Sequence, residues 1–235
     1  MVKGRIVAIS GAAGGLGPTV VRAFSAAGAT LAVAGRDAEK LGRVLDEAGV
    51  PADRRLTTRA DLSDPADARS WAEAVTGAFG RVDAVIHLVG GYAAGTSIEE
   101  IALEEWTSLE RMLVTTTLNV ARAFAAQLKT GGWGRFIAVT SPKVQAPTAK
   151  SALYAMGKAA SDALVLALAD ELRGTGATAN LVVVDSIDTP EARGGAKKPY
   201  GKSTPAEEIA AAMLFLCSEE AATINGVRLP LTGRG

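Results

Sequence analysis

The feature that most constrains this chain is a short apolar strand that runs directly into a glycine-rich turn and then into a helix. Ile6-Val7-Ala8-Ile9 is followed, after Ser10, by Gly11-Ala12-Ala13-Gly14-Gly15-Leu16-Gly17. Pro18 is tolerated next because it falls in the first turn of a helix. Glycines let the backbone turn sharply and let an anion approach, while the helix start offers it free N–H groups. The pattern predicts a phosphate-binding turn, although a tight connection without a ligand has the same glycines.

Strand-like and helix-like segments alternate along the rest of the chain. Short apolar and β-branched runs predict strands, and longer alanine-rich segments with helical periodicity predict helices. The expected strands are Arg5 to Ser10, Thr30 to Ala34, Val82 to Val89, Arg135 to Thr140 and Thr178 to Val184. The expected helices are Pro18 to Ala27, Ala38 to Ala48, Pro65 to Phe79, Leu103 to Leu128, Ser151 to Arg173 and Pro205 to Cys217. This alternation predicts a single α/β domain over residues 1–235, a Rossmann-type doubly wound parallel sheet with helices on both faces.

Charge and cysteine content narrow the partners and the compartment. The 25 Lys and Arg residues balance 25 Asp and Glu residues, so we expect a small-molecule partner, no nucleic acid and no membrane. Cys217 is the single cysteine, which excludes an intramolecular disulfide and favours a reducing compartment. The N-terminal residues lack the apolar stretch of a secretory signal, and no apolar run approaches the ~18 residues of a membrane span. These features predict a cytoplasmic protein.

The end of the second expected strand bears on which dinucleotide binds. It reads Ala34-Gly35-Arg36-Asp37. At this point of a dinucleotide fold a carboxylate accepts hydrogen bonds from the ribose hydroxyls of NAD, whereas an arginine clamps the 2′-phosphate of NADP. Arg36 therefore predicts a preference for NADP(H). NAD(H) stays possible if Asp37 turns inward, and Arg36 has the alternative of being a solvated residue at a helix start.

A tyrosine and a lysine lie four residues apart on the strongest helix pattern of the chain. Tyr154 and Lys158 share one helix face. A phenol has a pKa near ~10, and a nearby ammonium favours the phenolate, which brings the group toward a range useful for proton transfer. Ser141 ends the strand before this helix, where parallel-sheet proteins keep their ligand groups. Its hydroxyl would bond the same substrate oxygen as Tyr154.

Together the glycine turn, Ser141, Tyr154 and Lys158 resemble the short-chain dehydrogenase/reductase family, and the resemblance covers essentially the whole chain in order. Ser10 to Gly17 matches the family's Thr-Gly-x-x-x-Gly-x-Gly with Ser in place of Thr. Three further segments are similar to family segments: Asp61-Leu62 to the adenine-contacting Asp, Ile187-Asp188-Thr189 to the segment that holds the nicotinamide carboxamide, and Ile224 to Gly235 to the closing strand and tail.

This resemblance implies an NAD(P)-dependent oxidoreductase that interconverts a carbonyl and an alcohol by hydride transfer. Ser141 would orient and polarise the carbonyl oxygen, and Tyr154 would donate or accept the proton. Lys158 would hold the ribose hydroxyls and lower the pKa of the tyrosine. The family usually assembles through the helices that correspond to Leu103 to Leu128 and Ser151 to Arg173, which are apolar on more than one face. We therefore expect a homo-oligomer, either a tetramer or a dimer.

Departures from the family pattern leave two alternatives open. The family's Asn-Asn-Ala-Gly aligns with His87-Leu88-Val89-Gly90, in which only the glycine is kept; the resemblance implies that Gly90 contacts the cofactor. In a second departure, Leu113 stands in the place of the family's active-site Asn. Val184-Asp185 replaces the Pro-Gly before Ile187. One alternative is a cofactor-binding regulatory or structural protein that has lost turnover. The other is an enzyme like the dihydropteridine reductases, which act on a quinonoid ring, because Val89 to Gly95 looks somewhat like their corresponding segment.

Two further segments bear on the site. His87 is the only histidine, and a single histidine is more often a satisfied strand-end residue than a metal ligand, so we predict no metal. A substrate loop is expected at about residues 190–203. Its basic residues are more typical of a solvated lid than of a guide for an anionic substrate; they are Arg193, Lys197, Lys198 and Lys202.

Overall fold

A seven-stranded parallel sheet forms the centre of the fold. The computed structural model describes residues 2–190 and 203–231. The strand order is β3-β2-β1-β4-β5-β6-β9, with every neighbouring pair parallel. The strands are β1 (Ile6–Ser10), β2 (Thr30–Gly35), β3 (Arg55–Arg59), β4 (Ala84–His87), β5 (Gly134–Thr140), β6 (Ala177–Val184) and β9 (Arg228–Leu231). The order reverses between β1 and β4, and ligands bind at such switch points in doubly wound folds. The predicted fold class is confirmed.

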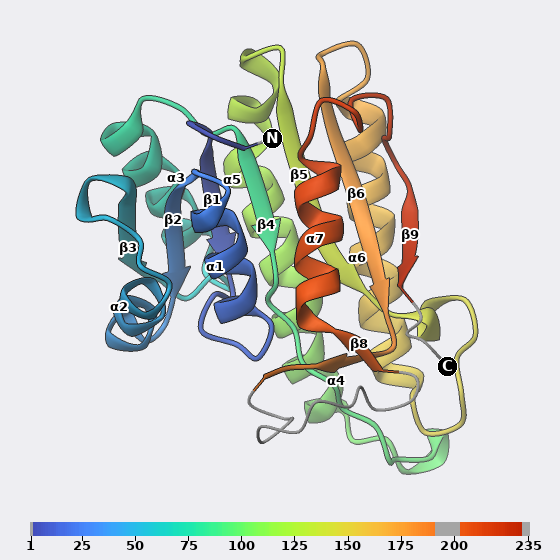
Figure 1. Ribbon diagram of the computed structural model, residues 1–235. Coiled ribbons are helices and arrows are strands. Elements are labelled where there is room, and N and C mark those ends of the chain that lie inside the picture. The colour runs from blue at the N-terminus through green and yellow to red at the C-terminus, as the bar shows by residue number, and fades with distance from the viewer. Residues whose placement is uncertain (1, 191–202, 232–235) are drawn as a thin grey trace.

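Helices cover both faces of this sheet (Figure 1). One face carries α1 (Gly17–Ala26), α2 (Ala38–Glu47) and α7 (Ala206–Leu216). The other carries α3 (Pro65–Phe79), α5 (Thr116–Thr130) and α6 (Ala152–Glu171), with α4 (Leu103–Glu110) leading into α5. By length and composition α6 is apolar enough to cross a membrane, which differs from our expectation that no run approaches this length. Half of its most apolar stretch is buried within the fold, as in a core helix.

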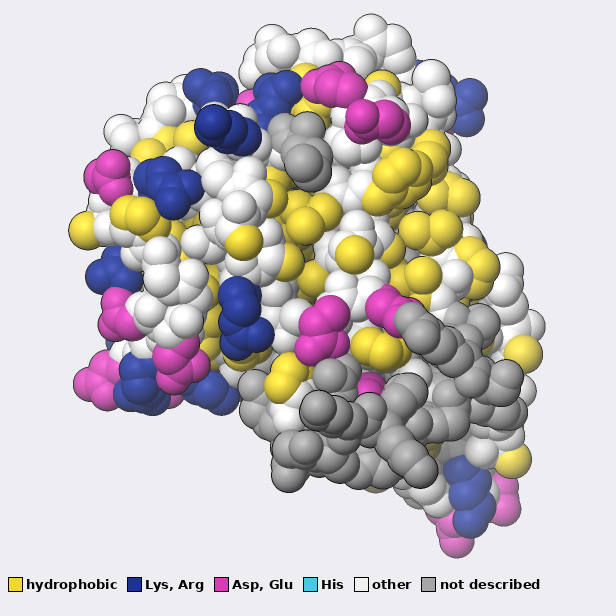
Figure 2. All heavy atoms as spheres, viewed as in Figure 1, with side chains coloured by type: hydrophobic (Ala, Val, Ile, Leu, Met, Phe, Trp, Pro, Cys, Tyr) yellow, Lys and Arg dark blue, Asp and Glu magenta, His cyan; other side chains and the backbone are white. Residues whose placement is uncertain are grey.

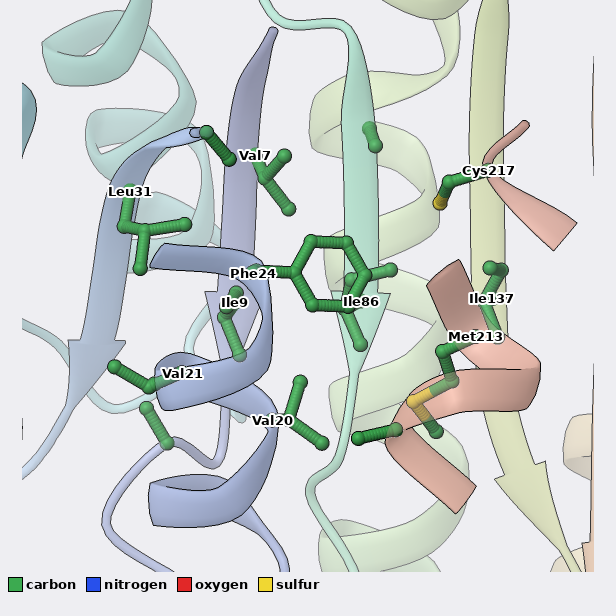
Figure 3. Packing of buried hydrophobic residues seen from close by; sticks show 14 of the residues in the cluster. Val7, Ile9, Val20, Val21, Phe24, Leu31, Ile86, Ile137, Met213 and Cys217 are labelled. Carbon is green, nitrogen blue, oxygen red and sulfur yellow. The ribbon is translucent and has the colours of Figure 1, made fainter. Parts of the chain in front are cut away.

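The central strands are buried on both sides because their side chains alternate between two apolar layers. Val7 and Ile9 pack with Phe24 of α1 and Met213 of α7, as Figure 3 shows. The intervening strand residues pack on the opposite layer, which contains Trp71 of α3. Burying one such side chain contributes ~1.5–3 kcal/mol. The two layers hold the sheet in place and so fix where each strand ends.

An edge strand and a divided helix are among the elements that differ from the sequence-based expectation. β3 (Arg55–Arg59) was not predicted, because its sequence Arg-Leu-Thr-Thr-Arg has one apolar residue and its side chains are at most half-buried at the edge of the sheet. The single helix expected over Leu103 to Leu128 is divided: a π-helical segment, Arg111–Thr115, separates α4 from α5. π-helical turns are common at functional sites.

The carboxyl ends of the strands meet at one edge, at the bottom of Figure 1, where α4 and β8 also lie. There a second, two-stranded sheet pairs β7 (Ser186–Asp188) with β8 (Ser203–Pro205). Most of the expected substrate loop, residues 191–202, lies outside the described residues, as do all four of its basic residues. Every predicted site residue belongs to this edge or to the helices that start from it.

Candidate active site

The glycine turn after β1 has the geometry of an anion-binding turn. Gly11 has a φ of 75°, and a Cβ there would lie 2.8 Å from the carbonyl carbon of Leu88. A Cβ on Gly17 would lie 2.0 Å from the carbonyl oxygen of Ala12. No side chain caps the start of α1 at Leu16. The Gly17 N–H donates to the carbonyl oxygen of Gly14 at 3.1 Å, and Pro18 has no N–H. At Gly11 and Gly17 the turn admits only glycine.

A cavity of about 700 Å³ opens beside this turn. Its volume lies within the ~300–1,000 Å³ range of small-molecule sites. The predicted cofactor-binding residues among its lining are Gly11, Gly14, Arg36, Asp61, Leu62 and Gly90. Residues of the α4–α5 region line the opposite wall, including Arg111 and Met112. The cavity therefore brings together residues from five segments that are far apart in the sequence, and its size and lining fit the adenosine part of a dinucleotide.

Arg36 and Asp37 have separate positions at the end of β2. Arg36 is exposed and lines the cavity, and its carbonyl oxygen accepts a hydrogen bond from Arg59 Nε at 3.3 Å. The Asp37 side chain accepts from the backbone N–H of Lys40 at 2.9 Å and caps the start of α2. A carboxylate used as a helix cap satisfies an otherwise unpaired N–H. Both residues line the cavity, and the Asp37 carboxylate is the one engaged by a backbone N–H.

Asp61 is held by two neighbours on the cavity wall. Its Oδ1 accepts from the Ser63 hydroxyl at 2.6 Å, and its Oδ2 accepts from Arg111 Nη2 at 3.0 Å. The hydrogen bond from Ser63 is the main cause that lowers the pKa of Asp61, and the Arg111 and Arg36 charges act in the same direction. Arg111 escaped the sequence reasoning because nothing in its local pattern distinguishes it from an exposed helix residue.

Ser141 and Tyr154 face each other at the end of β5. Ser141 is buried, and its Oγ accepts from the backbone N–H of Lys143 at 3.2 Å. Burial is the main cause that raises the pKa of Tyr154, and a hydrogen bond with Ser141 opposes it. The net direction is opposite to the one expected from Lys158. At neutral pH the phenol is therefore protonated, which is the form that donates a proton.

Lys158 lies one helical turn after Tyr154 and is also buried. Its Nζ donates to the carbonyl oxygen of Val139 at 2.9 Å. Burial lowers the pKa of Lys158 to about 8, although the charge of Asp162 acts in the opposite direction. A Cβ on Gly90 would lie 3.3 Å from this Nζ, so the glycine leaves room for the ammonium beside the cavity. The structure thus brings Ser141, Tyr154 and Lys158 together at the edge where Gly90 ends the cavity.

Tyr92, which was not singled out as a site residue, packs against the site. Its ring meets the ring of Tyr154 edge to face, with centroids 5.0 Å apart and an interplanar angle of 72°. Two-thirds of Tyr92 (67%) is exposed. The signal for it was the Gly-Gly-Tyr segment after β4, which indicated a likeness to another enzyme group but not a contact with Tyr154.

Leu113, in the place of the family's Asn, is packed tightly. It lies in the π-helical segment, and a Cβ on Gly157 would come within 2.9 Å of its Cδ1. Its carbonyl oxygen accepts from the hydroxyls of Thr117 at 2.6 Å and Ser161 at 2.7 Å. Gly157, between Tyr154 and Lys158, therefore provides the space that the leucine fills.

His87 is buried and neutral, and its two ring nitrogens form hydrogen bonds with β1 and α5. The Thr117 hydroxyl donates to the carbonyl oxygen of Leu113, so it must accept from His87 Nε2, at 3.0 Å. The Ser10 hydroxyl then donates to Nδ1 at 2.8 Å. Burial, with a smaller contribution from the charge of Lys158, lowers the pKa of His87 to about 3. The interpretation of His87 as a satisfied strand-end residue is confirmed.

The segment after β6 closes over the glycine turn. Thr189 Cγ2 lies 3.6 Å from the position of a Cβ on Gly15, and Ile187 of β7 packs against the α1–α7 layer. Thr189 therefore lies next to the turn. In the described part of the chain, no group of three or more His, Cys, Asp and Glu side chains is arranged to hold a metal ion.

Comparisons with known proteins agree with this geometry. A family model described as enoyl-(acyl carrier protein) reductase matches residues 11–233. The chain is 28% identical over 244 residues to a D-threitol dehydrogenase of Mycolicibacterium smegmatis, with 99% of this chain and 93% of the relative covered. It is also 28% identical over 258 residues to an NADPH-dependent aldehyde reductase-like protein, chloroplastic, of Arabidopsis thaliana, with 99% and 94% covered.

A solved structure extends the likeness to three dimensions. The 3-ketoacyl-(acyl-carrier-protein) reductase from Brucella melitensis, complexed with NADH, is 26% identical and aligns with a TM-score of 0.87 over 98% of each chain. The matched region includes the glycine turn, the cavity and the Ser141–Tyr154–Lys158 group.

Proposed function

Because this chain belongs to the short-chain dehydrogenase/reductase family of oxidoreductases, we propose that it interconverts a small-molecule carbonyl and its alcohol with NADP(H) as the preferred cofactor. The observation that carries the proposal is the grouping of Ser141, Tyr154 and Lys158 beside the cavity that begins at the glycine turn. We propose that residues 1–235 act as one dinucleotide-binding catalytic domain with a substrate loop at about residues 190–203, and that the protein works in the cytoplasm.

Each of the three side chains has a distinct part in the proposed reaction. NADP(H), when bound, supplies or takes up the hydride. The Ser141 hydroxyl orients and polarises the carbonyl oxygen of the substrate. Tyr154, protonated at neutral pH because burial raises its pKa, gives its proton to that oxygen in the reductive direction. Lys158 presents its ammonium to the ribose hydroxyls of the cofactor beside Gly90.

The direct test is the oxidation of NADPH by a panel of aldehydes and ketones. We expect turnover of at least one carbonyl class, followed at 340 nm. If the protein binds NADPH and yet turns over no carbonyl compound, the regulatory or structural alternative is favoured instead. The buried Leu113 supports that alternative, whereas the intact three-residue group argues against it.

A substrate with a flat conjugated ring is the second candidate. The Tyr92 ring is largely exposed and lies against the Tyr154 ring, so it offers an aromatic surface to such a substrate. Quinonoid dihydropterin belongs in the same panel of substrates for this reason. A turnover higher on the quinonoid ring than on simple ketones would favour the dihydropteridine-reductase-like alternative.

The cofactor preference is tested at Arg36. Arg36→Ala is expected to weaken NADPH binding by ten- to a hundredfold and to leave NADH binding nearly unchanged, because a charge-assisted contact to the 2′-phosphate contributes ~1.5 to 3 kcal/mol. Fluorescence titration gives both affinities. Arg43→Ala, on the exposed face of α2, is the matched control and should change neither. Equal affinities of the unmodified protein for NADPH and NADH would refute the preference.

Assembly into a homo-oligomer, most simply a tetramer, is proposed from the apolar surface. Leu118 of α5, Met156 of α6 and Phe215 of α7 are large hydrophobic side chains that are 39%, 51% and 47% exposed. Figure 2 shows further hydrophobic side chains gathered over β9. Light scattering should give a mass that is a multiple of the 24.0 kDa chain. A monomer mass at micromolar concentration would contradict the proposal.

A further inference from the structure

A buried ion pair joins α6 to the last strand of the sheet. Arg228 Nη1 of β9 donates to Asp162 Oδ2, and the two side chains are 18% and 4% exposed. Asp162 follows Lys158 by four residues on α6, so the two side chains lie on the same face of the helix, ~5–6 Å apart at Cβ. The ion pair therefore lies directly beside the lysine assigned to the cofactor.

The ammonium of Lys158 needs a negative partner because it is buried. Its hydrogen bond to the Val139 carbonyl oxygen engages a neutral acceptor, and a buried charge without an opposite charge is strongly unfavourable. Four titratable or charged groups face the Lys158 ammonium: His87 on β4, Tyr154 and Asp162 on α6, and Arg228 on β9, behind Asp162. Strand β5 contributes two uncharged polar groups, the Val139 carbonyl and the Thr140 hydroxyl. His87 and Tyr154 are neutral. Among the described residues, the negative charge that acts on Lys158 is that of Asp162.

Arg228 in turn keeps Asp162 in its charged form. Burial raises the pKa of Asp162, while the nearby Thr140 hydroxyl and the charges of Arg228 and Lys158 lower it. A buried ion pair is a poor source of stability, since a well-packed apolar pair often serves as well. The Asp162–Arg228 ion pair has an effect that an apolar pair would lack: it holds a carboxylate at a fixed point near the buried ammonium of Lys158.

Near Gly90 the ammonium has an apolar neighbour. Leu113 Cδ2 lies 3.8 Å from the position of a Cβ on Gly90, and that position is 3.3 Å from Lys158 Nζ. The Leu113 side chain at this wall is apolar. The Val139 carbonyl oxygen of β5 and the Asp162 charge on α6 supply the polar support of the ammonium.

We infer that Asp162 is a positioning residue for Lys158: anchored by Arg228, it is the counter-charge that holds the lysine ammonium in place beside Gly90 and the cofactor cavity. The inference rests on the proposed function, in which Lys158 contacts the cofactor ribose. It assigns to β9 a part in the site, because the last strand carries the anchor of the counter-charge.

The test is the pH dependence of NADPH affinity, measured by fluorescence titration between pH 6 and 10. The affinity of the unmodified protein should fall above pH about 8, as Lys158 loses its charge. In Asp162→Asn the ammonium lacks its counter-charge and deprotonates more readily, so the fall should begin about one pH unit lower. The affinity of this variant should then be up to about threefold weaker than that of the unmodified protein at pH values between the two. Asp162→Glu, which keeps the carboxylate, should restore the fall to the higher pH.

A matched control and a second variant separate this role from a structural one. Glu171→Gln removes another carboxylate of α6, which pairs with Lys129, and should leave the pH of the fall unchanged. Asp162→Asn leaves Arg228 buried and unpaired, which could destabilise the fold. The double variant Asp162→Asn/Arg228→Met, which lacks both charges, is therefore made in parallel. Its NADPH affinity should fall at the same lowered pH as that of Asp162→Asn. A folded variant of either kind that binds NADPH with the unmodified pH profile overturns the inference. If the unmodified protein binds no dinucleotide at any pH, the proposed function fails, and the inference fails with it.

Discussion

Replacing Tyr154 with Phe is expected to lower turnover by about 10²- to 10⁴-fold and to leave the fold and NADPH affinity nearly unchanged. The substitution removes one oxygen, the proposed proton donor, and general acid catalysis contributes a factor of this size. The ring remains, so its contact with Tyr92 is preserved. The measurement is the kcat of the two proteins on one confirmed carbonyl substrate, with NADPH affinity by titration and folding by circular dichroism.

The matched control is Tyr92→Phe, which removes the hydroxyl of the neighbouring ring. Tyr92 has no assigned part in proton transfer, so this variant should keep most of its turnover. If Tyr154→Phe keeps full activity, the proton donor is misassigned. His87 is a poor substitute, because both of its ring nitrogens are engaged and burial lowers its pKa to about 3.

The fold could be predicted because the strands at its centre are buried on both faces. Runs such as residues 5–10 and 178–184 are apolar enough to identify by themselves, and the helices between them show a clear period. β3 did not have this signal: it is an edge strand with a single apolar residue, and its pairing with β2 decides its structure. The break between α4 and α5 depends on backbone hydrogen bonding, which the apolar pattern of residues 103–128 does not encode.

Parts of the candidate site could be predicted where residue type and sequence spacing alone indicate a function. The glycine turn, Arg36 and the three-residue group are of this kind. The role of Asp37 as a helix cap required the structure, since it depends on where α2 starts. Arg111 and Asp162 required the structure too, because each has its partner in a distant segment. Asp61 lies 50 residues from Arg111 in the sequence, and Arg228 lies 66 residues from Asp162.

The departures from the family pattern are coupled to each other in space. Leu113 occupies the position of a polar residue, and Gly157 supplies the room for it. The Leu113 carbonyl oxygen accepts hydrogen bonds from two hydroxyls, so this carbonyl is engaged without an amide side chain. His87 uses Thr117, one of these two hydroxyl donors, as its partner. The group is internally satisfied, which argues for a rearranged site and against a decayed one.

Replacing Lys158 with Met should differ in kind from the loss of the Tyr154 hydroxyl, because both cofactor affinity and turnover should fall. The substitution keeps an unbranched side chain of similar length and removes the ammonium that lies beside Gly90. We expect NADPH affinity to weaken by on the order of tenfold, the size of one charge-assisted contact, and turnover to fall by about 10²-fold or more. Titration and steady-state kinetics separate the two effects, and Lys143→Met, next to Ser141, is the control that should keep both.

The effect of Lys158→Met on NADPH affinity should depend on pH. Burial lowers the pKa of Lys158 to about 8, so the unmodified protein carries the charge below that pH and loses it above. The affinity difference between the unmodified protein and Lys158→Met should therefore be largest near pH 6 to 7 and should shrink as the pH rises past 8, because the two proteins then carry the same charge at this position. A difference that stays constant from pH 6 to 10 would mean that the lysine contributes through its packing, and the assignment of its ammonium to the cofactor would be wrong.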